Sequence, residues 1–92
     1  MIDLNQIMEP SEGVVGRVVD DEAVIVLPGK GKVKVLNEVG AFIWSQVDGH
    51  RSVVEIALLV CEEYDVDQPQ AEEDTITFLA DLQERGVLSV VE

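Results

Sequence analysis

The stretch Val33-Lys34-Val35-Leu36-Asn37-Glu38-Val39-Gly40-Ala41-Phe42-Ile43-Trp44 decides the fold of this chain. Its first residues alternate between apolar and charged side chains, which is the pattern of a half-buried β-strand. From Val39 onward the apolar residues recur with the spacing of a helix instead. Asn37 lies where the period changes, and its side chain is suited to cap the first helical turn. The sequence therefore predicts a strand that leads directly into an amphipathic helix.

Two more strands are expected before this one. Val14, Val15, Val18 and Val19 mark the first strand, residues 23–27 form the second, and residues 32–36 form the third. Residues 20–22 separate the first pair, and Pro28-Gly29-Lys30-Gly31 separates the second pair with two glycines that tolerate positive φ. Because such short turns join antiparallel neighbours, the pattern predicts a meander in which the first and third strands are the edges.

The first two helices are predicted from their caps and apolar spacing. The helix after Asn37 should end near Asp48-Gly49 and bury four apolar residues at helical spacing, namely Val39, Phe42, Ile43 and Val47. The second helix opens with a capping box, in which Ser52 and Glu55 satisfy each other's backbone amides.

The third helix should begin at Asp67, with Pro69 in its first turn, and stop at Gly86. Its apolar line is formed by Ala71, Thr75, Phe78 and Leu82, broadened by Ile76 and Leu79. The order βββααα predicts an α+β domain: a three-stranded antiparallel β-meander followed by a three-helix bundle, with a winged helix-turn-helix-like outline. The 92 residues suffice for one domain. We expect residues 1–12 to be a flexible N-terminal arm and residues 13–92 to form the domain.

The charge of the chain argues against nucleic acid and anionic membranes as partners. The formal net charge is −13, and residues 48–92 hold two basic and twelve acidic side chains. A DNA-recognition helix needs Arg or Lys for phosphates, whereas the third helix offers Arg85 alone against several carboxylates. Self-repulsion of this charge favours a monomer.

No apolar run is long enough to span a bilayer, no secretory signal is visible and Cys61 is the single cysteine, so a cytoplasmic location is expected.

Catalysis is not expected. His50 is the only histidine and lies in the turn before the second helix, while Cys61 lies among apolar residues without a second nearby histidine to activate it. The carboxylate clusters Glu62-Glu63 and Glu72-Glu73-Asp74 lack the His or Cys ligands that would complete a metal shell. The sequence therefore predicts a protein that is not an enzyme and has no metal or cofactor.

The third predicted strand has two interpretations. Alternation places Val33 and Val35 on one face, with Lys32, Lys34 and Leu36 on the other. Lysines on an exposed edge discourage aggregation between sheets. Alternatively, the edge is kept open for one chosen peptide strand, and the lysines select it by charge. The residues by themselves leave both interpretations open.

Residues 36–44, followed by Asp48-Gly49 and by Val53-Val54-Glu55-Ile56, look like the core of the PqqD-like family. The segment 63–67 and the later Phe78-Leu79, Leu82 and Gly86-Val87-Leu88 continue the match, which covers about residues 14–90. The order and spacing of these segments carry the resemblance.

The resemblance implies a recognition element for ribosomally synthesised, post-translationally modified peptides (RiPPs). Such domains hold the leader of a precursor peptide and present it to a modifying enzyme, often a radical SAM protein, as in pyrroloquinoline quinone biosynthesis. The leader adds antiparallel to the third strand, in the groove beside the third helix. Carried onto this chain, the peptide-binding residues are Lys32, Val33, Lys34, Val35, Leu36, Thr75, Phe78, Leu82 and Arg85, with Asp74 or Asp81 at the rim. The alternative hypothesis is a winged-helix-like module for protein–protein contacts in transcription regulation.

Overall fold

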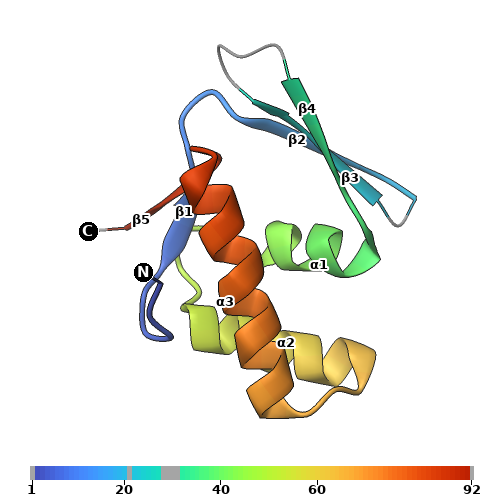
Figure 1. Cartoon of the computed structure of the whole chain (residues 1–92), viewed down its shortest axis with the longest axis vertical. Coiled ribbons are helices and arrows are strands. Elements are labelled where there is room, and N and C mark those ends of the chain that lie inside the picture. The colour runs from blue at the N-terminus through green and yellow to red at the C-terminus, as the bar shows by residue number, and fades with distance from the viewer. Residues whose placement is uncertain (1, 21, 28–31, 92) are drawn as a thin grey trace.

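The computed structural model describes residues 2–20, 22–27 and 32–91, and the side chains of Leu27 and Lys32 are left undescribed. Five strands and three helices follow one another along these segments (Figure 1). In chain order they are β1 (Met8–Pro10), β2 (Val15–Val19), β3 (Glu22–Leu27), β4 (Lys32–Leu36), α1 (Glu38–Gln46), α2 (Val53–Tyr64), α3 (Gln68–Glu84) and β5 (Leu88–Val90). The predicted order of three strands and three helices is confirmed, and β1 and β5 are additions to it.

The strands β2, β3 and β4 form the predicted antiparallel meander, with β3 in the centre. The predicted bounds of β4 are confirmed, whereas the predicted turn at residues 28–31 lies outside the described residues. Because side chains alternate along a strand, Ile25 and Leu36 are buried on the face toward the helices. The opposite face is an apolar surface open to solvent, formed by the exposed side chains of Val15, Val19, Val26, Val33 and Val35.

Each helix begins at the cap that the sequence predicts. The Asn37 side chain accepts a hydrogen bond from the Gly40 amide at 2.9 Å, and both hydrogen bonds of the Ser52–Glu55 capping box are present. The Asp67 side chain accepts from the Gln70 amide at 3.0 Å, next to the first-turn proline of α3. Because Asn37 directly follows β4, its cap fixes the angle between the edge strand and α1.

The core lies between the inner face of the meander and the helices, which Figure 1 shows gathered to one side of the sheet. Ile43, Ile56 and Leu79 bring one large buried side chain from each helix. One core prediction is wrong: Val39 is 36% exposed, and the neighbouring Gly40 and Ala41 are buried in its place. These two small residues allow α1 to approach its neighbours closely, so the helix turns its smallest side chains inward.

The N-terminal segment differs from the flexible arm that the sequence predicts. Its strand β1 pairs antiparallel with β5, and Met8 is fully buried. The carbonyls of Leu4 and Gln6 each accept a hydrogen bond, at 2.9 Å, from the amides of Val54 and Val53 in the first turn of α2. Those amides have no partner within the helix. The segment is therefore held by a distant strand and a helix end, neither of which local periodicity reveals.

None of the helices in the described part of the chain is long and apolar enough to cross a membrane.

Candidate functional site

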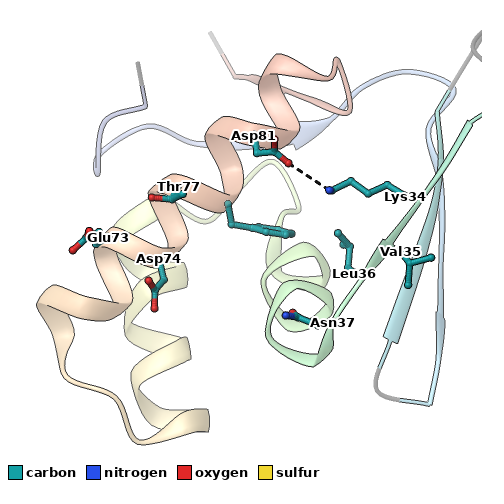
Figure 2. Close-up of a pocket in the computed structure, with 9 residues that line it drawn as sticks. Lys34, Val35, Leu36, Asn37, Glu73, Asp74, Thr77 and Asp81 are labelled. Carbon is teal, nitrogen blue, oxygen red and sulfur yellow. Dashed lines mark ion pairs between the residues drawn. The ribbon is translucent and has the colours of Figure 1, made fainter.

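A groove of about 660 Å³ lies between β4 and α3 (Figure 2). Residues 34–36 of β4 and residues between 73 and 81 of α3 contribute to it, and Asn37 lies at one end. Its lining residues are Lys34, Val35, Leu36, Asn37, Glu73, Asp74, Thr77, Phe78 and Asp81. The two elements run in opposite directions along the groove, so Lys34 lies near Asp81 and Asn37 lies toward Asp74.

One backbone edge of β4 borders the groove. Within the described ranges β4 pairs with β3 alone, and the chain's terminal strands pair with each other in a separate two-stranded sheet. The groove-side edge of β4 therefore has no strand neighbour among the described residues. In an antiparallel sheet, alternate residues of an edge strand direct both backbone groups outward, so this edge can accept one further strand.

The floor of the groove is apolar. Leu36 is buried at the end of β4, and Phe78 is half-buried on α3. Gly40 explains how the phenyl ring reaches this position, because a Cβ atom at Gly40 would lie only 2.9 Å from Cε1 of Phe78. Because Gly40 has no side chain, α1 leaves room for the Phe78 ring on α3. An apolar side chain that enters the groove would find a preformed surface contributed by β4 and α3.

Charged side chains bridge one end of the groove. The Lys34 ammonium lies 3.5 Å from Oδ2 of Asp81, and Nε of Arg85 donates to the same oxygen at 3.1 Å. Partial burial raises the pKa of the Asp81 carboxyl, but the hydrogen bond from Arg85 and the charges of Arg85 and Lys34 outweigh it, so the pKa lies below its ordinary value. Asp81 is therefore ionised at neutral pH and holds Lys34 across the groove.

The structure brings only part of the predicted peptide-binding set together. Lys34, Val35, Leu36 and Phe78 line the groove, as do both predicted rim residues, Asp74 and Asp81. Lys32 is the first residue of β4, and the structure describes only its backbone. Val33 belongs to the opposite, solvent-facing side of the sheet, and the side chain of Val35 is 60% exposed there, so Val35 borders the groove mainly through its backbone.

Three predicted residues, two on α3 and one at its C-cap, lie outside the groove lining. Thr75 and Leu82 are fully buried in the core, and the Thr75 hydroxyl has no hydrogen-bond partner in the described part of the chain. Arg85 is exposed and reaches the groove only through its pairing with Asp81. The residues of α3 that face the core and those that face the groove form adjacent rows on the same helix. An apolar pattern alone therefore assigns core residues to the groove.

Sequence reasoning missed Asn37, Glu73 and Thr77 as lining residues. The helical spacing of the residues already predicted at the groove could have indicated two of these three residues, Glu73 and Thr77. Asp74, Phe78 and Asp81 recur at intervals of four and three, and Glu73 and Thr77 flank that row. Asn37 is predicted as a cap, and it does cap α1, but its position at the strand–helix junction also makes it a lining residue of the groove.

The two residues considered for catalysis lie away from this groove. His50 is exposed, and its backbone amide donates to Asp48 at 2.9 Å. Cys61 is half-buried on α2. Neither lines the groove.

An open strand edge beside an apolar groove defines a small α+β domain of the kind that accepts a peptide strand. The chain belongs to the PqqD family, since the sequence model of that family, described as Coenzyme PQQ synthesis protein D (PqqD), matches residues 22–88. No curated protein sequence matches the chain.

Solved structures share the fold over nearly their whole length. TbiB1, solved in complex with the TbiA(beta) leader peptide, is 34% identical, with a TM-score of 0.81 over 88% of this chain and 94% of that chain. A lasso peptide synthetase B1 complexed with its leader peptide is 22% identical, with a TM-score of 0.80 over 89% and 96%. The PqqD truncation of Methylobacterium extorquens PqqCD, described as a functional and stand-alone RiPP recognition element, is 24% identical, with a TM-score of 0.81 over 97% and 95%.

Proposed function

We propose that this chain is a non-catalytic recognition element that binds the leader of a ribosomally synthesised precursor peptide. The leader adds antiparallel to the groove-side edge of β4, and its apolar side chains enter the groove against Phe78 and Leu36. The domain then presents the rest of the precursor to a modifying enzyme, of the radical SAM type. The open edge of β4 beside this groove is the observation that carries the proposal.

The similar structures support this function over a protein–protein module in transcription. TbiB1 and the lasso peptide synthetase B1 were both solved with leader peptides. The family description supports a place in the biosynthesis of pyrroloquinoline quinone or a related peptide product. A cytoplasmic location and a monomeric state belong to the same proposal, and the self-repulsion of the negative charge supports the monomer. The net charge of −13 supports a neutral or basic partner rather than nucleic acid.

We infer that binding affinity comes mainly from apolar contacts in the groove rather than from backbone hydrogen bonds between the leader and β4. The five residues of β4 offer roughly five hydrogen bonds to a guest strand, each worth about 1 kcal/mol net. Ordering the guest costs about 1–2 kcal/mol per residue, so the ladder alone does not reach the −8 kcal/mol or so of a micromolar complex. Apolar burial at about 25 cal/mol per Å² must supply the difference.

Titration of ¹⁵N-labelled protein with candidate leader peptides from its own genome tests the proposal. We expect the largest amide shifts along β4 and on the groove side of α3, from residue 73 to residue 81. A scrambled peptide of the same composition serves as the control. Absence of binding, or shifts confined to the outward-facing valines of the sheet, would reject the function at this site.

Replacing Gly40 by alanine should weaken leader binding while leaving the fold intact. Alanine is favoured over glycine in a helix by up to about 1 kcal/mol, which offsets part of the strain of the new methyl group against Phe78 and against Oδ1 of Asn37, 3.3 Å away. That group would meet the Phe78 ring at 2.9 Å and displace it into the groove. We expect a several-fold rise in Kd with little change in Tm, measured by calorimetric titration and thermal unfolding. An unchanged Kd would show that the ring position is irrelevant to binding.

A further inference from the structure

The carboxylates of the groove are unevenly compensated. At one end, Asp81 pairs with Lys34 at 3.5 Å and with Arg85 at 3.1 Å. Glu73 and Asp74 line the other end and are exposed. Asp74 accepts a hydrogen bond from the neutral Gln70 side chain at 2.8 Å, and neither carboxylate forms an ion pair with any residue that the structure describes. The groove lining thus includes two uncompensated negative charges toward the N-terminal end of α3, and Figure 2 shows Asp74 on the side nearer Asn37 while Glu73 points away from β4.

From this asymmetry we infer that the leader carries a basic side chain where it passes Glu73 and Asp74. The inference rests on the proposed function, because it concerns the peptide that occupies the same groove. An acidic or neutral residue at that place would face two carboxylates without a cation, whereas Lys or Arg would complete the compensation that Lys34 and Arg85 provide at the opposite end. The two carboxylates therefore act as a filter for charge.

The spacing of the groove residues gives the position of that basic residue in the leader. Asp74 and Phe78 are four residues apart on α3, which is about 6 Å along the helix axis. Two residues of an extended strand advance about 6.6 Å and bring a side chain back to the same face. A leader that places an apolar residue on Phe78 therefore has its basic residue two positions away.

The direction of the leader decides whether its basic residue comes before or after its apolar residue in the peptide sequence. The strand β4 runs from the Lys34–Asp81 end of the groove toward the Asn37–Asp74 end (Figure 2). An antiparallel guest runs the opposite way, so it meets Glu73 and Asp74 before it reaches Phe78 and then Lys34. The structure therefore assigns the order basic, any residue, apolar to the bound segment, read from its N-terminus.

Leader peptides that differ at one position test this order. The leader found by titration is synthesised with Lys, Gln or Glu two residues before the residue that contacts Phe78, and each Kd is measured by calorimetry at about 50 and 300 mM salt. Exposed ion pairs contribute modestly and are screened, so we expect Lys to bind about tenfold more tightly than Glu at low salt, with the ratio falling at high salt. The double variant Glu73→Gln/Asp74→Asn should reduce that ratio to about twofold or less.

The matched control is Glu62→Gln/Glu63→Gln, which removes the same charge from exposed positions of α2 outside the groove lining. It should preserve the preference for Lys, and an equal loss in both double variants would overturn the inference in favour of a general charge effect. Equal binding of the three peptides would also overturn it, while leaving the proposed function intact. If none of the three peptides binds, the proposed function fails and the inference falls with it.

Discussion

Replacement of Phe78 by alanine is expected to weaken leader binding about 30-fold. The ring is half-buried, lies against Gly40 and forms the main apolar surface of the groove. Burial of a phenyl side chain contributes roughly 1.5–3 kcal/mol, and a loss of about 2 kcal/mol corresponds to about a 30-fold change in Kd. Calorimetric titration of the variant with the native leader measures the effect.

Because Phe78 also packs against the core, a general loss of structure must be separated from a loss of contact with the peptide. Ile76→Ala provides the matched control, since Ile76 is half-buried on the same helix but does not line the groove. We expect Ile76→Ala to lower Tm with less than a threefold change in Kd. A Phe78→Ala protein that keeps its amide spectrum and binds as the native chain does would exclude Phe78 from the site.

Blocking the backbone edge of β4 should have the larger effect, a loss of binding of about a hundredfold or more. Proline at Val35 removes one backbone amide proton and places a ring on the strand. If Val35 directs its amide toward the guest, the variant folds and leader binding is lost, because one bond disappears and the approach of neighbouring backbone is obstructed. Calorimetry measures binding, and the amide spectrum shows whether the meander persists.

A scan of the leader by N-methylation tests the same edge without altering the protein. Antiparallel pairing makes alternate guest residues donate to β4 while the residues between them point their amides away. Methylation should therefore abolish binding at every second position and change it little at the positions between. A uniform response along the leader would contradict strand addition, whatever the outcome for Val35→Pro.

The parts of the fold that depend on local chemistry could be predicted from the sequence. The bounds of β4 follow from the alternation over residues 32–36, and the start of each helix follows from a side chain that satisfies nearby amides, as Ser52 and Asp67 do. Such signals involve residues within three or four positions of one another, so they persist whatever the rest of the chain does.

The parts that depend on distant partners could not be predicted in the same way. Pairing of β1 with β5 joins residues some eighty positions apart, and three-residue strands are too short to show a period. On α3, the sequence predicted Thr75 and Leu82 to lie in the groove, whereas packing of α3 against α2 and β5 buries them. One residue rotates a helix by about 100°, so only the packing decides which row of α3 faces β4.

The pairing of β1 with β5 has a consequence for how this domain can be joined to others. It brings the entry and exit of the chain together, and Figure 1 shows both on the side of the molecule opposite β4. A linker attached at either terminus can leave without crossing the groove. Fusion proteins attached at these ends, and circular permutants in which the two ends are joined, should therefore keep the groove accessible. An enzyme tethered at either end would receive its substrate at a high effective concentration.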